Sequence, residues 1–266
     1  MIHDEGVGLE HRDRIAYVTL DRPDVMNRFE GRMREALADA LQTAARDTRV
    51  RVVVIRGAGT AFSAGADVNG MVELHAQGDI DEIRRRVEFG AEVIRAVRDA
   101  PKPVIAAIHG VAAGAGANLA LACDLRVGSP TASLTESFVR IGLLPDWGGL
   151  HSLVRLVGPG RAAEVMMRGE TLDAGRLLEL GILNRIFPVE SFPDDVHAYA
   201  TRLAGESPDA LAAIKSGIAI ATDGTLDDVL AFERAAQPRL FAGGNCREGM
   251  AAFLERRRPE FRDLER

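Results

Sequence analysis

The apolar positions in the first half of the chain follow two different spacings. Two runs rich in β-branched residues, at 50–57 (VRVVVIRG) and 104–110 (VIAAIHG), have the continuous hydrophobic character of buried strands. Residues 14–23 (RIAYVTLDRP) also indicate a strand, which ends at a proline-containing turn. Residues 30–47 carry apolar side chains at helical spacing, and a charged helical stretch follows at 79–100. The pattern predicts strands that alternate with helices.

The pattern divides the whole chain into a mixed core and a helical C-terminal region. Residues 58–70 (AGTAFSAGADVNG) form a loop of small residues, and 114–128 predict a helix that passes into a strand. Alternating strands and helices indicate an α/β fold with right-handed crossovers. Beyond about residue 190 only helical spacing is found. The sequence therefore predicts a core at 1–195 and a helical C-terminal region at 196–266.

The charge balance excludes some classes of partner. Lys+Arg 33 against Asp+Glu 39 gives a formal net charge of −6, which lacks the basic footprint of a nucleic-acid-binding protein. The N-terminal residues are too polar for a signal peptide, and no apolar run approaches a membrane span. Two cysteines, Cys123 and Cys246, give no disulfide framework. We therefore expect a cytoplasmic protein that binds neither nucleic acid nor membrane.

The sequence does not contain the usual motifs for dinucleotide binding, metal binding or a serine nucleophile. Phe62 stands where the glycine loop after VVVIRG would need its third glycine to bind a dinucleotide, and Leu119 does the same in GAGANL. The six histidines form no metal-binding spacing, so no metal site is predicted. Ser63 lies outside a GxSxG motif, and no histidine and acid can be assigned to it as partners.

Two glycine- and alanine-rich segments, AFSAGAD and HGVAAGAGAN, each follow a predicted buried strand. Small side chains allow a ligand to approach the backbone N–H groups closely. The second segment also opens a helix, whose first N–H groups are unpaired and carry partial positive charge. Two such loops that converge can hold a developing oxyanion. Tight packing of a strand on a helix explains either loop taken alone.

The segment FVRIGLLPDWGG contains an unusual carboxylate. Proline, aspartate and glycine each suit a tight turn, so Asp146 can be a turn residue. The only tryptophan of the chain, Trp147, stands directly beside it after an apolar run. An acid enclosed by apolar side chains has a raised pKa and becomes a stronger base. Both interpretations of Asp146 stay open at this point.

Together these motifs resemble the enoyl-CoA hydratase/isomerase (crotonase) superfamily. The similarity covers nearly the whole chain, from VTLDRPDVMN to REGMAAFLERRRPEF, with the motifs in the same order. The resemblance implies a spiral of ββα units in the core, which binds an acyl-CoA thioester, and a helical C-terminal region that forms a homotrimer or a hexamer. Coenzyme A would be part of the substrate, and no separate cofactor is implied.

The resemblance also assigns site residues. The two backbone N–H groups of the oxyanion hole would be those of Ala66 and Ala115. The two catalytic glutamates of hydratases are replaced by Asn118 and Phe138, neither of which can act as a general base. Asp146 instead matches an aspartate of one branch of enoyl-CoA isomerases, which includes the ring-opening isomerase of phenylacetate breakdown.

These positions favour moving a proton over adding water. Asp146 would remove the C2 proton of a 3-enoyl-CoA, and the same carboxylic acid would return it at C4 to give the 2-trans isomer. Leu144, Trp147 and Phe138 would form an apolar wall that raises the pKa of Asp146. The alternatives are a hydratase or related lyase in which Asn118 positions a water, and an acyl-CoA-binding protein without catalysis.

The first loop would bind the coenzyme A moiety. The resemblance places the adenine against backbone groups near Ala61, Ala64 and Asp67, with Val68 in the same loop. Arg28 can meet a phosphate of coenzyme A or remain a solvated surface residue. Trp147 replaces a small residue of the family and can either narrow the acyl pocket or pack elsewhere. An apolar surface on the C-terminal helices fits oligomerisation; its residues are Leu211, Ile214, Ile218, Leu230, Phe232 and Phe241.

Overall fold

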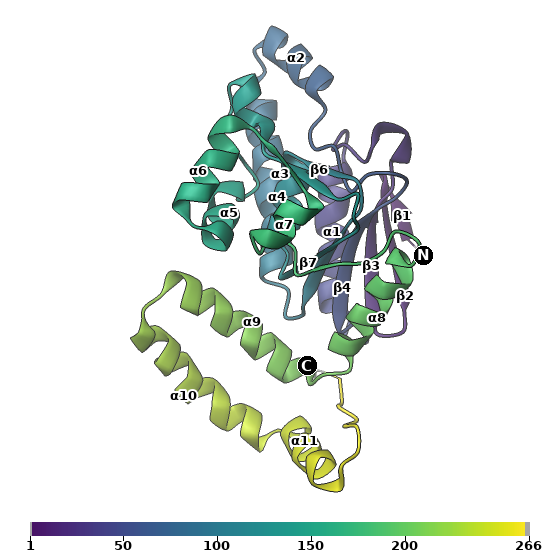
Figure 1. Ribbon diagram of the computed structural model, residues 1–266, viewed down its shortest axis with the longest axis vertical. Coiled ribbons are helices and arrows are strands. Elements are labelled where there is room, and N and C mark those ends of the chain that lie inside the picture. Colours follow the sequence, from purple (N-terminus) through teal and green to yellow (C-terminus); the bar gives the residue numbers. More distant parts are fainter. Residues whose placement is uncertain (1, 264–266) are drawn as a thin grey trace.

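The computed structural model describes residues 2–263 and contains a seven-stranded main sheet (Figure 1). The first three strands are antiparallel, and from β3 onward neighbouring strands run parallel. In spatial order the strands are β1 (Ile2–Asp4), β2 (Val7–Arg12), β3 (Ile15–Leu20), β4 (Val52–Gly57), β5 (Val104–Ile108), β7 (Leu125–Gly128) and β10 (Arg185–Ile186).

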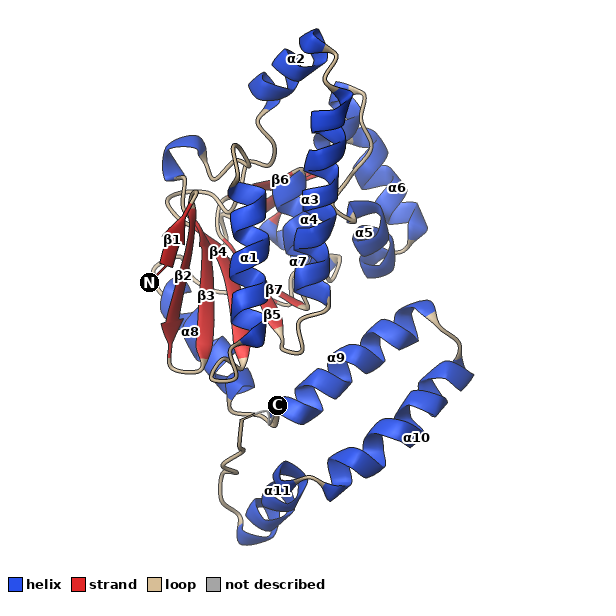
Figure 2. Cartoon of the chain, turned by 180° about the vertical axis from the view of Figure 1, so that it is seen from behind, coloured by secondary structure: helices blue, strands red, loops and turns tan. Residues whose placement is uncertain are grey.

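Helices cover both faces of this sheet (Figure 2). Alternate residues of β3, β4 and β5 contribute to two separate hydrophobic clusters, one with α1 and α3 and the other with α8. Because both faces are buried, these strands have the continuous apolar runs that their sequence shows. The helices are α1 (Met33–Arg46), α3 (Ile80–Arg98) and α8 (Phe192–Ala204).

A smaller sheet extends the fold beside the carboxyl end of β5. Its strands are β6 (Val111–Ala113), β8 (Ser133–Thr135) and β9 (Thr171–Asp173), in the order β6-β8-β9. Around it lie α4 (Ala115–Ala122), α5 (Gly149–Val157), α6 (Pro159–Arg168), α7 (Ala174–Glu179) and the short 3₁₀ helix η2 (Ser137–Ile141). Another 3₁₀ helix, η1 (Pro23–Val25), follows β3, and α2 (Val68–Gln77) stands at one end of the molecule (Figure 1).

The C-terminal helices project away from the sheets (Figure 1). They are α9 (Pro208–Asp223), α10 (Leu226–Ala242) and α11 (Gly244–Glu255). Lys215 on α9 reaches back to the core, where its ammonium group lies 2.7 Å from the carboxylate of Asp124. None of the helices in the described part of the chain is both long and apolar enough to cross a membrane.

The predicted α/β architecture is confirmed, with differences at its margins. The hairpin of β1 and β2 was not expected, because β2 is buried only over its first half and its end is polar. The expected boundary after residue 195 falls inside α8, which packs Val196, Ala200 and Ala204 against the sheet. This helix therefore lies with the core, and the projecting part begins at α9.

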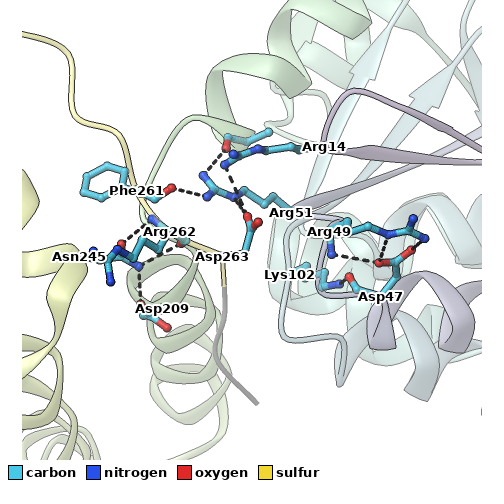
Figure 3. A network of polar contacts seen from close by, with 11 residues as sticks. Arg14, Asp47, Arg49, Arg51, Lys102, Asp209, Asn245, Phe261, Arg262 and Asp263 are labelled. Atoms are coloured by element: carbon cyan, nitrogen blue, oxygen red, sulfur yellow. Dashed lines mark hydrogen bonds and ion pairs between the residues drawn. The ribbon is translucent and has the colours of Figure 1, made fainter.

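The chain after α11 returns to the core and is held there by Arg51 (Figure 3). The buried guanidinium of Arg51 donates hydrogen bonds to the carbonyl oxygens of Ala204 (3.1 Å) and Phe261 (2.5 Å) and pairs with Asp263 at 2.7 Å. Asn245 on α11 binds the returning segment by donating to the carbonyl oxygen of Arg262. The projecting helices are thus tied to the core at both ends.

We expect Arg51→Met to lower the free energy of unfolding by about 2–3 kcal/mol, because two main-chain carbonyls lose a charged donor. The released tail should also become sensitive to trypsin near Arg256. Urea unfolding and limited proteolysis measure the two effects. Arg49→Met is the control, since its side chain is 85% exposed and its ion pair with Asp47 is worth less than about 1 kcal/mol. Equal stability of the two variants would contradict the role of Arg51.

Candidate active site

Asn27 shapes the first glycine- and alanine-rich loop from within. Its side chain is completely buried, and its backbone adopts φ +56°, a left-handed conformation that asparagine tolerates. The side-chain amide donates hydrogen bonds of 2.8 Å to the carbonyl oxygens of both Ala58 and Ala61. The hydroxyl of Ser63 donates to the carbonyl oxygen of Asn27, also at 2.8 Å. This network sets the course of residues 58–63.

The two loops lie against each other. Gly65 has φ +83°, and a Cβ placed on it would lie 2.4 Å from the carbonyl oxygen of Ala113 and 3.4 Å from the nitrogen of Ala115. Only glycine fits there, so the chain leading to Ala66 passes directly beside the start of α4. Among residues 2–263, neither Ala66 nor Ala115 donates a hydrogen bond through its main-chain N–H. Their role as oxyanion donors stays a prediction.

Asp146 has a largely enclosed carboxyl group. Its Oδ1 is buried and has no hydrogen-bond partner among the described residues. Burial raises the pKa of Asp146 to about 6, against the opposing effects of its own main-chain N–H and of the positive charge of Arg34. The carboxylate is therefore ionised at neutral pH and more basic than an exposed aspartate.

Asn118 holds the turn that carries Asp146. Its side chain is completely buried, and its amide donates a 2.9 Å hydrogen bond to the main-chain carbonyl of Asp146. A Cβ on Gly149 would lie 2.1 Å from Asn118 Oδ1, so the turn passes close to the amide. The amide nitrogen of Asn118 is thus paired with the neighbouring backbone, whereas its Oδ1 is buried and has no hydrogen-bond partner among the described residues.

The apolar surroundings of Asp146 differ from the predicted wall. Leu144 is 67% exposed, so the prediction that it helps to bury Asp146 is wrong; the turn directs it to solvent. Trp147 is buried and packs on Phe29, with ring centroids 4.6 Å apart. A Cβ on Gly90 of α3 would lie 2.2 Å from the indole nitrogen, so the tryptophan fills space under that helix.

Phe138 lies on the other side of the second loop. Its ring comes within 3.6 Å of the position that a Cβ on Gly114 would occupy. Gly114 itself has φ +51° and donates through its N–H to the carbonyl oxygen of Thr135 at 3.0 Å. The structure thus places Phe138 beside the start of α4.

Two charged residues near Asp146 were missed by the sequence analysis. Glu136 is completely buried, and neither of its carboxyl oxygens has a hydrogen-bond partner among residues 2–263. Arg34 on α1 is also buried and donates to the carbonyl oxygen of Phe29 at 3.1 Å. The only signal for Glu136 was its place two residues before Phe138.

Several groups that were expected to bind coenzyme A already make hydrogen bonds or ion pairs within the protein. The carbonyl of Ala61 accepts from Asn27, and the N–H of Ala64 donates to Met26 at 2.8 Å. Arg28 lies 2.8 Å from Glu30 and 3.7 Å from Asp67. Asp67 also caps α2, which starts at the half-exposed Val68. The structure brings Arg28 to the first loop, and contact with coenzyme A stays a prediction.

The described residues contain no group of three or more His, Cys, Asp or Glu side chains that could hold a metal ion. The groups that the structure brings together here are the buried carboxyl group of Glu136, the carboxyl group of Asp146 with its buried Oδ1, and two adjoining backbone loops.

Comparison with known proteins identifies the family. The sequence profile of the enoyl-CoA hydratase/isomerase family matches residues 10–264. The chain belongs to this family. The resemblance drawn from the motifs is thereby confirmed, and an acyl-CoA substrate is consistent with the family.

Relatives in the family differ in activity. The 1,2-epoxyphenylacetyl-CoA isomerase of Escherichia coli is 35% identical over 255 residues, which are 95% of this chain and 97% of that protein. A probable enoyl-CoA hydratase of Rhodobacter capsulatus is 37% identical over 252 residues, 95% and 96% of the two chains. An enoyl-CoA hydratase from Polaromonas sp. JS666 superposes with a TM-score of 0.91 at 35% identity, covering 96% of this chain and 99% of the other. The crotonase-like fold is confirmed.

We expect Asn27→Ala to lower the free energy of unfolding by about 2–3 kcal/mol, because buried carbonyl oxygens lose their donor. Asn27→Asp should be at least as harmful, since a carboxylate oxygen would face those carbonyls. Thermal unfolding measures both variants. Asp24→Ala, in the same turn but exposed, is the control and should change stability by less than about 0.5 kcal/mol. A stable Asn27→Asp protein would show that this network does not hold the loop.

Proposed function

We propose that this protein is an acyl-CoA isomerase that converts a 3-enoyl-CoA into the 2-trans-enoyl-CoA. The observation that supports it best is the carboxyl group of Asp146, whose buried Oδ1 has no hydrogen-bond partner among the described residues and whose pKa is raised to about 6. A base with this pKa is mostly ionised at neutral pH and can still take a proton from carbon. The two glutamate positions of hydratases hold Asn118 and Phe138 instead.

In the proposed reaction, Asp146 removes a proton from C2 and the electron pair moves into the thioester. The N–H groups of Ala66 and Ala115 hold the enolate oxygen, because donors already aimed at the developing charge need no reorganisation. A proton is then returned at C4 from a carboxylic acid of the site, and the double bond lies between C2 and C3. Asn118 acts by holding the main chain of Asp146 in place.

A hydratase is the second candidate, because a second buried carboxyl group, that of Glu136, lies near enough to Asp146 to be affected by its charge. Water addition uses one group to activate the water and another to protonate the substrate. Incubation with a 3-enoyl-CoA and a 2-trans-enoyl-CoA in parallel separates the candidates. Migration of the double bond supports the isomerase, and addition of water supports the hydratase. Binding without turnover would overturn both.

We expect Asp146→Asn to keep the fold and acyl-CoA binding but to lower isomerisation at least ~10²-fold, because the amide cannot accept the proton. The rate of double-bond migration and the affinity for the thioester are measured in parallel. Asp173→Asn is the matched control: Asp173 caps α7 by accepting from Arg176, and an asparagine does the same. Full activity of Asp146→Asn would end the proposed role of this base.

We also propose that the chain forms a trimer or a dimer of trimers through the C-terminal helices. Their exposed apolar side chains include Ile214, Ile218, Leu230, Phe241 and Phe253. Surfaces of this kind mark interaction sites in soluble proteins. Sedimentation velocity at micromolar concentration should give a trimer or hexamer, and Ile218→Glu should shift it toward smaller species. Val189→Glu, at an exposed apolar position outside these helices, is the control. A monomeric wild type would contradict this assembly.

A further inference from the structure

The buried carboxyl group of Glu136 is not explained by the fold. A carboxylate that is completely enclosed without hydrogen bonds loses its hydration with no compensation, so the neutral acid is favoured. Burial and, second, the charge of Asp146 raise the pKa of Glu136 to about 8. Glu136 is therefore protonated at neutral pH and holds a proton inside the site.

The backbone fixes Glu136 beside the second loop. The residue before Glu136 is Thr135, and its carbonyl oxygen accepts a hydrogen bond from the N–H of Gly114. The residue after Gly114, Ala115, is the first residue of α4. Across the site, Asn118 at the start of the same helix holds the main chain of Asp146. One loop thus connects the segments that carry the two carboxyl groups.

The surrounding charges give the two carboxyl groups different pKa values. Burial raises the pKa of both groups; the positive charge of Arg34 partly offsets this effect at Asp146, whereas the charge of Asp146 raises the pKa of Glu136 further. Asp146 therefore ionises first, and at neutral pH the pair carries a single negative charge. The other charged groups that act on Arg34 are Arg86, Glu35 and Glu82.

We propose that Glu136 is a second proton-carrying residue of the site and works as one unit with Asp146, in which one carboxyl group takes the substrate proton and the other gives a proton back. This inference rests on the proposed isomerase function. It replaces a single shuttling acid with a pair of carboxyl groups.

The steps balance without any further reactant. The C2–H bond breaks, an O–H bond forms on Asp146, and the electron pair enters the thioester enolate. The O–H bond of Glu136 then breaks, a C–H bond forms at C4, and Glu136 is left as the carboxylate. Once Asp146 is neutral, its charge no longer adds to the effect of burial on the pKa of Glu136, so Glu136 is a stronger acid at the moment when the enolate needs a proton. Transfer from Asp146 to Glu136 restores the starting state.

Glu136→Gln tests this inference, because it keeps the size of the side chain and removes the proton carrier. Wild-type kcat/KM should rise as Asp146 ionises near pH 6 and fall as Glu136 ionises near pH 8. In Glu136→Gln the alkaline fall should be absent. The rate at pH 7 should drop about tenfold, less than for loss of Asp146, because Asp146 can still return the proton itself. Glu136→Asp should restore the alkaline fall.

Isotope transfer gives a second readout that a purely structural role would not change. With a mixture of unlabelled 3-enoyl-CoA and 3-enoyl-CoA dideuterated at C2, the wild type should deliver the abstracted deuterium to C4 of other molecules or exchange it with solvent, since the proton that reaches C4 comes from Glu136. Glu136→Gln should retain the label at C4 of the same molecule, because only Asp146 then carries it. Mass spectrometry of the product measures the retained fraction. Ser137→Ala, the neighbouring residue, is the control and should behave as the wild type.

The outcomes separate this inference from the function on which it rests. A wild type that moves no double bond overturns the proposed function and this role together. Isomerisation whose pH profile and label retention are unchanged in Glu136→Gln overturns the role of Glu136 alone. If Glu136→Gln does not fold, infrared spectra of the wild type decide: the band of a protonated carboxylic acid should be present at pH 7 and vanish as the pH rises through about 8. Its absence at pH 7 overturns the inference.

Discussion

The site depends on the hydrogen bonds that Asn27 makes inside the first loop. Without this donor, the carbonyl oxygens of Ala58, Ala61 and Phe62 would lose a hydrogen bond, at a cost of about 1–3 kcal/mol for each one that is left buried and unsatisfied. Asn27 satisfies them and, through its own carbonyl, positions Ser63. Because Ser63 lies directly against Gly116 of α4, the same network also sets the distance between the two loops. An enolate can be held by both loops only if this spacing is kept.

The parts of the fold that could be predicted are those in which the local sequence pattern alone shows that the residues are buried. β4 and β5 are covered on both faces, so their apolar runs identify them directly. β2 and the short strands of the smaller sheet cannot be identified in this way, because their pairing is decided by tertiary contacts. The boundary at α8 was misplaced for a related reason: a helical pattern does not tell which surface the helix covers.

The site divides in the same way. Asp146, Ala66 and Ala115 could be proposed because the motifs that contain them resemble those of the family. Glu136 could not, since its sequence neighbours show neither its burial nor its missing hydrogen-bond partners. Leu144 shows the opposite error, as an apolar residue beside the acid whose side chain faces solvent. A carboxyl group acquires its pKa from the three-dimensional surroundings, which linear proximity does not report.

Gly90 and Trp147 lie on separate elements, yet they share one space between α3 and the Asp146 turn. The indole occupies the volume that any side chain at position 90 would need. The two positions are therefore a coupled pair, in which the size of one residue limits the size of the other. A larger residue at position 90 therefore requires a smaller residue at position 147, and substitutions at the two positions are expected to occur together, in evolution as in engineering.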